Sequence, residues 1–176
     1  MKDILKVVMD AAGVHEYGIV ETAQIEFSHE VRKMCEANTC RQYGKTWACP
    51  PAVGTVEVCR DKCLQYEKAI VFTGKFQLED SFDIDGMELA MKDFKKIVAA
   101  VGAGVKPHLN NFLLLGNEGC GACEVCAYPG NPCRFPEKAH GSIEGYGIWV
   151  NKVAEAAGVR YINGVNTVTF FGALLY

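Results

Sequence analysis

The chain has 176 residues, of which 18 are basic and 21 acidic, so its formal net charge is −3. This length suits a single domain, residues 1–176, that is large enough to bury a core without covalent crosslinks. No long run of basic or acidic residues occurs, which argues against nucleic acid or a membrane surface as a partner. The nine cysteines therefore need a reason other than disulfide stapling.

The two ends of the sequence favour a cytoplasmic protein. In "MKDILKVVMDAAGVHEYG" the apolar residues alternate with Lys and Asp, and no continuous apolar run precedes a cleavage site. The apolar "YINGVNTVTFFGALLY" is too short for a membrane-spanning helix and is interrupted by two glycines. Because cytoplasmic thiols stay reduced, cysteine richness here indicates metal or redox chemistry rather than disulfides.

Apolar periodicity predicts helices and strands that alternate along the first half of the chain. The expected order is a helix over 1–12, a strand over 17–27, a short helix capped by Ser28, an irregular proline-containing segment over 36–54, a helix over 56–67 capped by Thr55, and a strand over 69–78.

The second half continues the alternation. We expect an amphipathic helix from Asp83 to about residue 103 that Gly102 and Gly104 end, then a buried strand over 108–116 and a cysteine loop over 117–136. A helix capped by Ser142 should follow and stop at Gly158. One or two final strands with a turn at Asn163-Gly164 complete the chain, and we expect the last strand to be internal to the sheet. The predicted fold class is α/β: one domain with a mixed sheet, helices and two cysteine-rich cluster-binding loops.

The stretch "GCGACEVCAYPGNPCRFP" carries the most specific pattern in the chain. Its thiols, at Cys120, Cys123, Cys126 and Cys133, are separated by two, two and six residues. Three evenly spaced cysteines suit one corner of a [4Fe–4S] cubane, although a bacterial ferredoxin has a last gap of three and a proline after its fourth cysteine. The turn dipeptides before Cys133 let it close the same cluster. A four-cysteine zinc site is the alternative.

A second group of thiols precedes it. Cys35, Cys40 and Cys49 lie in or beside the irregular segment, and Cys59 and Cys63 lie four residues apart on the following helix. We predict that the first three hold a second cluster, with Cys59 as the fourth ligand and Cys63 ranked after it. The alternative is that Cys59 and Cys63 are small buried apolar residues.

Other polar residues give weaker signals. Arg134 and Lys138 flank the second loop, where they would dock an acidic partner or steady a cluster's negative charge, unless they are ordinary solvated charges. His140 is a minor candidate for metal binding or proton transfer. The sequence contains no P-loop, no dinucleotide-binding glycine motif and no serine-nucleophile motif.

The segments "CEANTCRQYGKTWACPPAVG" and "CGACEVCAYPGNPCRFPEKAHGSIEGYGIWV" together resemble a cysteine-rich family of predicted metal-binding proteins (domain of unknown function 2284) from anaerobic bacteria and archaea. The resemblance covers roughly residues 30–150. It implies metal binding at Cys35, Cys40, Cys49, Cys120, Cys123, Cys126 and Cys133. Some members resemble this chain but have a cysteine where it has Tyr146; if that cysteine is their fourth ligand for the first site, this chain must use another, for which we choose Cys59.

Three functions follow from these patterns. The leading one is a protein with two [4Fe–4S] clusters that transfers single electrons to a redox partner protein in anaerobic metabolism. The second is a redox enzyme or enzyme subunit in which one cluster has three protein ligands and an open iron. The third is an interaction module stabilised by zinc.

Overall fold

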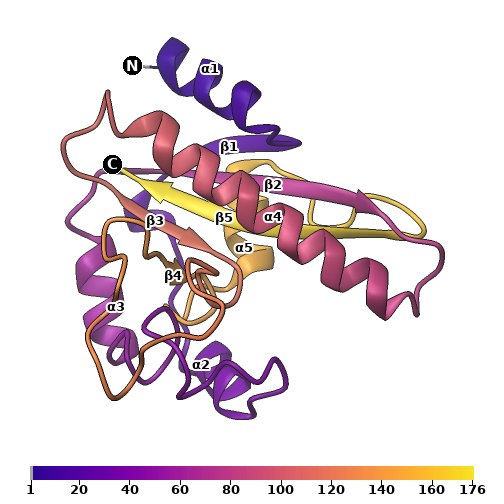
Figure 1. Ribbon diagram of the computed structural model, residues 1–176. Helices are drawn as coiled ribbons and strands as arrows, with labels where there is room; N and C mark the ends of the chain where they lie inside the picture. The colour runs from indigo at the N-terminus through magenta and orange to yellow at the C-terminus, as the bar shows by residue number, and fades with distance from the viewer. Residues whose placement is uncertain (1) are drawn as a thin grey trace.

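The computed structural model describes residues 2–176, which form one five-stranded sheet with helices on both faces (Figure 1). The helices are α1 (Lys2–Ala12), α2 (His29–Glu36), α3 (Val56–Cys63), α4 (Ile84–Val105) and α5 (Val150–Ala157), and the strands are β1 (Glu16–Glu21), β2 (Lys68–Gln77), β3 (Leu113–Gly116), β4 (Gly141–Ser142) and β5 (Thr167–Leu175). The strand order is β1-β2-β5-β3-β4, in which only β3 and β4 run parallel. The predicted α/β fold with a mixed sheet is therefore confirmed.

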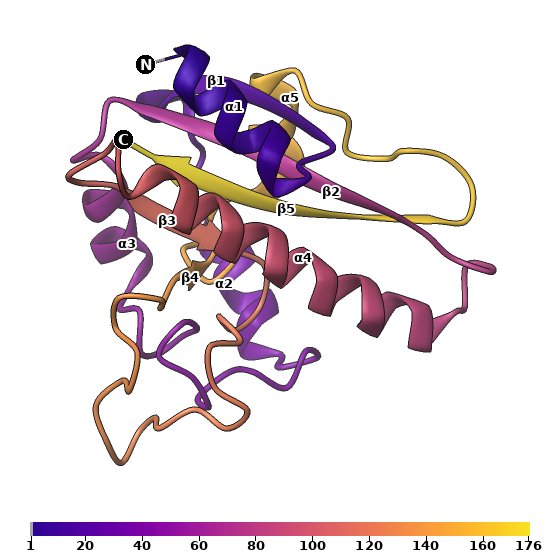
Figure 2. The same cartoon turned by 45° about the horizontal axis from the view of Figure 1, so that its top comes forward.

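The two central strands supply residues to both faces of the sheet. Ile70 and Phe72 of β2 face α1 and α4, whereas Ala69 and Val71 face α3 and α5, because successive side chains of a strand point to opposite sides. Both views show α4 lying along one face of the sheet and α5 behind the other face (Figures 1 and 2). The last strand, β5, pairs with β2 and β3, so the expectation that it is internal is confirmed.

Three predicted helix starts are confirmed by their caps. The Ser28 hydroxyl accepts from the N–H of Glu30 at 3.1 Å, and the Thr55 hydroxyl accepts from the N–H of Val58 at 3.3 Å. The Asp83 carboxylate accepts from the N–H of Gly86 at 2.8 Å. Each cap satisfies a backbone donor that has no partner inside its own helix.

Gly102 and Gly104 do not end α4, which was predicted to stop there. The helix continues to Val105, and the two glycines allow close packing instead. A Cβ on Gly102 would lie 2.9 Å from the side chain of Leu114, and one on Gly104 would lie 2.7 Å from that of Val8. Glycine in a helix interior costs about 1 kcal/mol relative to alanine. Here the absence of a side chain allows α1 and β3 to pack closely against α4.

Other element boundaries also differ. Helix α3 ends at Cys63 rather than residue 67, and β3 begins only at Leu113. Ser142 caps no helix: it lies in β4, where its N–H donates to the carbonyl of Ala48 at 2.9 Å. Only one strand follows Gly158, so the predicted turn at Asn163-Gly164 lies in a connecting loop. No helix within residues 2–176 is both long and apolar enough to cross a membrane.

Candidate metal centre

The two cysteine-rich segments, far apart in sequence, lie side by side at one end of the sheet, below α4 in Figure 1. The Trp47 ring meets the Tyr128 ring edge-on with centroids 4.9 Å apart, and its indole N–H donates to the carbonyl of Asn131 at 3.1 Å. A Cβ on Gly119 would lie 3.3 Å from the Gln42 side chain. One tryptophan thus ties residues 37–55 to residues 117–140.

In the first segment, three thiols lie close enough to influence one another's ionisation. Cys35 is in the last turn of α2, Cys40 is exposed and Cys49 is buried. Burial raises the pKa of Cys35 to about 11, and the nearby Glu144 carboxylate and the Cys49 and Cys40 thiols raise it further. All three are free thiols, and the raised pKa values of Cys35 and Cys49 keep these two protonated until a metal replaces the proton.

Cys49 is held by the segment that follows the second loop. Its Sγ lies 3.7 Å from the Ser142 hydroxyl, with which it forms a hydrogen bond. Burial raises the pKa of Cys49, and the bond to Ser142 opposes that rise. Strand β4 therefore fixes the position of a thiol more than ninety residues earlier in the chain.

Cys59, the predicted fourth ligand, lies in a different environment. Its side chain is fully buried and accepts from the Arg32 guanidinium, with Nη2 and Sγ 3.6 Å apart. Burial raises the pKa of Cys59, with Arg32 acting against it, and burial raises the pKa of Cys63 to about 12 with a contribution from Cys59. Both thiols belong to the core packed against the sheet by α3 and α5.

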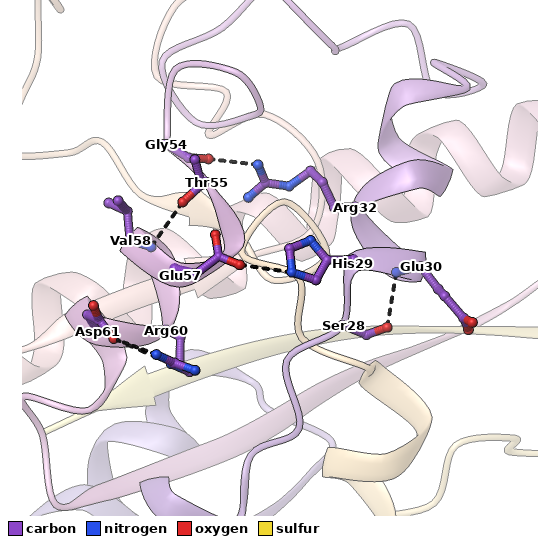
Figure 3. Close-up of polar contacts among 10 residues, drawn as sticks. All are labelled: Ser28, His29, Glu30, Arg32, Gly54, Thr55, Glu57, Val58, Arg60 and Asp61. Atoms are coloured by element: carbon purple, nitrogen blue, oxygen red, sulfur yellow. Dashed lines mark hydrogen bonds and ion pairs between the residues drawn. The ribbon is translucent and has the colours of Figure 1, made fainter.

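Arg32 joins four segments around these thiols. One guanidinium nitrogen donates to the Gly54 carbonyl at 2.7 Å (Figure 3). The other donates to the Gly145 carbonyl at 2.6 Å. Nearby, the ring of His29 lies 2.8 Å from the Glu57 carboxylate, a second connection between α2 and α3. Sequence reasoning missed Arg32, whose only signal was its place one turn before Cys35 in α2.

The second loop keeps all four of its predicted ligands half-buried and free. Cys120, Cys123, Cys126 and Cys133 lie in a stretch without helix or strand. The N–H of Asn131 donates to the carbonyl of Ala127 at 3.0 Å, which forms the turn expected between the third and fourth thiols. Arg134 folds back onto this loop, donating to the Val125 carbonyl at 2.8 Å, while Lys138 lies over the Phe135 ring.

Residues 2–176 contain no group of three or more His, Cys, Asp or Glu side chains already gathered around one point. The donor set nevertheless fits a thiophilic metal, since all eight candidate ligands are free thiols and six of them lie outside helices and strands. The two apolar cores of the sheet contain Cys59 and Cys63 and none of the other seven cysteines.

A cavity of about 360 Å³ lies between α2, α5 and β5, and Glu144, whose carboxylate influences Cys35, is one of its lining residues. Its walls are mainly apolar and aromatic, and its polar groups include Glu144 and Asn117. Asn117 is 6% exposed, and its Oδ1 has no hydrogen-bond partner within residues 2–176. Burial raises the pKa of Glu144 to about 7, although a hydrogen bond from its own backbone opposes the rise. Neither residue was predicted from sequence.

His140 is buried at the end of the second loop. Its Nδ1 lies 3.3 Å from the Gly141 carbonyl, and burial lowers its pKa, so the ring is neutral at pH 7. A Cβ on Gly116 would lie 2.9 Å from the ring, which shows how tightly β3 packs against it. The surroundings of His140 are thus those of a packed side chain beside Cys120.

Comparison with protein families matches residues 18–176 to the family described as predicted metal-binding protein (DUF2284). A search of the curated proteins and a search of the solved structures gave no match. The matched region includes both cysteine segments, Arg32, and all of the sheet except the first two residues of β1. This chain therefore belongs to the DUF2284 family of predicted metal-binding proteins.

Proposed function

We propose that this protein binds two [4Fe–4S] clusters and passes single electrons to a redox partner in the metabolism of an anaerobe. The observation that best supports this proposal is the contact of the two cysteine segments through Trp47. Seven free thiols come to one end of the domain in this way, and soft thiolates are the ligands that iron–sulfur clusters require.

The proposed ligands of one cluster are Cys120, Cys123, Cys126 and Cys133, and those of the other are Cys35, Cys40, Cys49 and Cys59. A [4Fe–4S] cluster supplies one-electron chemistry when bound. The surrounding residues would position the thiolates and limit the access of water: Ser142 holds Cys49, and Trp47 with Tyr128 covers the junction of the loops.

The fourth ligand of the first site has two candidates. Cys59 would have to leave its contact with Arg32, whereas the Glu144 carboxylate already lies near Cys35. We expect Cys59→Ser to lose iron from the first site if Cys59 is the ligand, and Glu144→Gln to lose it if the carboxylate is. Retention of all iron by Cys59→Ser removes Cys59 from the ligand set.

Anaerobic purification with measurement of iron, zinc and acid-labile sulfide tests the proposal. We expect about eight irons and about eight sulfides per chain, and a dithionite-reduced sample with the EPR signals of two interacting one-electron centres. Zinc without sulfide contradicts the proposal and supports the interaction module held together by zinc.

A second function is favoured by the cavity that Glu144 lines, because the Glu144 carboxylate also influences Cys35. A volume of about 360 Å³ falls within the range of small-molecule sites, roughly 300–1,000 Å³, and its unpartnered Asn117 oxygen would accept a hydrogen bond from a ligand. In that case the first site has three thiol ligands and an open iron facing a substrate. A change in the EPR spectrum on adding cyanide supports this enzyme function, and an unchanged spectrum contradicts it.

A further inference from the structure

A larger cavity, of about 1140 Å³, lies between α4, the edge of β3 and the second cysteine loop. We call it the lysine groove because six lysines line it: Lys62, Lys92, Lys95, Lys96, Lys106 and Lys138. Glu137 is the one acidic residue among the lining residues. A chain with a net charge of −3 thus gathers six of its 13 lysines around a single cavity.

Most of this positive charge is not neutralised within the described part of the chain. Lys95 lies 3.9 Å from Glu118, and Lys96 lies 2.6 Å from Asp93. The other four lysines form no ion pair within residues 2–176, and two of them only donate to backbone carbonyls. Such a groove attracts anions, since exposed charges of one sign raise the local concentration of the opposite sign.

Strand β3 leaves the groove open at the sheet edge. β4 pairs only with Leu115 and Gly116, so the first half of β3 has no strand partner on this side. Phe112 and Leu114 therefore contribute apolar surface to the groove, beside the small residues Ala99 and Ala103 of α4. An apolar floor with a charged rim is the usual composition of a protein–protein contact.

The spread of the lysines fits a protein surface better than a small anion. From Lys92 to Lys106, α4 rises about 21 Å at about 1.5 Å per residue, which exceeds the length of one phosphate or carboxylate ligand. The volume also exceeds the roughly 300–1,000 Å³ of most small-molecule sites. Contacts between redox proteins are typically small, wet and guided by charge.

The groove also reaches the candidate metal centre. Cys120 and Gly121 line its wall together with Trp47, the residue that joins the two cysteine segments. An acidic protein seated on the lysines would therefore contact the second cysteine loop directly. We propose that the lysine groove is the docking site of an acidic electron-carrier protein, an inference that rests on the proposed electron-transfer function.

The test measures the binding of an acidic ferredoxin and an acidic flavodoxin to the purified full chain by isothermal titration calorimetry. We expect binding at about 20 mM NaCl that weakens strongly at about 200 mM NaCl, because ionic strength screens exposed charges. In Lys92→Glu/Lys106→Glu, which reverses the charge at both ends of the groove, the affinity should fall at least about tenfold.

A matched control is Lys33→Glu/Lys75→Glu, which changes the net charge by the same amount. Both control lysines are exposed, form no ion pair within residues 2–176 and lie outside the groove. Lys75 is next to Gly74, which packs towards Phe94 of α4, so the Lys75 side chain points to the other face of the sheet. This control should weaken binding less than about twofold.

The single variant Lys92→Glu separates loss of binding from loss of folding. It should fold normally, since the Lys92 side chain has no hydrogen bond or ion pair within residues 2–176. An unchanged circular dichroism spectrum with weaker binding supports the groove. Equal losses in the groove and control variants overturn the proposal, as does absence of binding by the wild type at low salt. Stoichiometric binding of ATP or pyrophosphate that the groove variant abolishes overturns it too, because the groove is then a small-anion site.

Failure of the docking proposal is distinguishable from failure of the proposed function. Iron and sulfide content and dithionite reduction are measured without any partner, so they report on the function alone. If the protein holds two reducible clusters but binds neither acidic carrier, the electron-transfer function is supported and the docking role of the lysine groove is contradicted.

Discussion

At the scale of single residues, two charged side chains near the thiols act in opposite directions. The buried Arg32 guanidinium lowers the pKa of Cys59 against the effect of burial, whereas the Glu144 carboxylate adds to the burial that raises the pKa of Cys35. Without metal, both thiols remain protonated at pH 7. Metal binding must therefore release protons, so the affinity for metal should rise with pH.

The carboxyl of Glu144 gives a prediction about the metal-free protein. Its pKa rises from 4.5 to about 7 on folding, so between these values the folded state holds a proton that the unfolded state has released. Stability therefore falls as pH rises through this window, by about 2 kcal/mol after allowance for partial exposure. Urea unfolding at several pH values measures the fall.

Glu144→Gln is the control for that prediction. The amide keeps the shape of the side chain but does not titrate, so the variant should show a flatter stability profile between pH 5 and 7. Parallel profiles for the variant and the wild type would rule out Glu144 as the group responsible.

At the scale of elements, α5 lies against β1 at a point where no side chain fits. A Cβ on Gly18 would overlap the carbonyl oxygen of Ala157, the last residue of α5. This close approach lets α5 reach the sheet face that also holds Cys59 and Cys63. Glycine is required here by contact with backbone, which is less able to move than a side chain.

Gly18→Ala should therefore destabilise the protein by at least about 1–3 kcal/mol, the usual cost of overpacking. The free energy of urea unfolding of the metal-free protein measures it. Gly130→Ala is the matched control, since nothing lies within 4 Å of a Cβ at Gly130 and its backbone is compatible with alanine. A Gly18→Ala variant as stable as Gly130→Ala would show that α5 moves freely away from β1.

Elements also show what the sequence can predict. The sequence predicts Ser28 and Thr55 as helix caps and a helix start at Asp83, because a cap acts on backbone groups two or three residues away. The Ser142 hydroxyl likewise accepts from the N–H of Gly145 at 3.0 Å, but no helix follows, because Ser142 belongs to β4 and its N–H donates to Ala48, a partner remote in sequence. Gly102 and Gly104 likewise allow close packing against β3 and α1, and no local sequence pattern reveals these neighbours.

The candidate site likewise has features that the sequence predicts and features that depend on tertiary contacts. The thiol spacing in "CGACEVC" is local and indicates the second group of ligands directly. The surroundings of Cys59, by contrast, depend on Arg32 from α2 and on the packing of α3 against the sheet. Glu144 reaches Cys35 only because β4 joins the sheet edge. Sequence spacing therefore predicts the thiols better than the charges around them.

At the scale of the whole molecule, the protein consists of a sheet with two apolar cores and an end built from irregular segments. The cores contain Cys59 and Cys63 but none of the other seven cysteines. The core that α1 and α4 form on the sheet contains no cysteine, so its stability should be largely independent of metal, while the order of residues 37–55 and 117–140 should depend on metal.

Hydrogen exchange with and without metal tests this division. In the metal-free protein, amides of β2, β5 and α4 should stay protected, whereas amides of the two cysteine segments should exchange quickly and slow down on metal loading. The indole N–H of Trp47 should slow with them, since it donates across the two segments. Loss of protection throughout the sheet on metal removal would show that metal stabilises the entire domain.

The position of β5 has a consequence for how the protein is made. β5 follows both of its neighbours in chain order, so β2 and β3 have no strand between them while they leave the ribosome. The two cysteine segments hang from these separate parts of the nascent chain. The contact between the two segments through Trp47 should therefore be completed only when β5 has joined these parts.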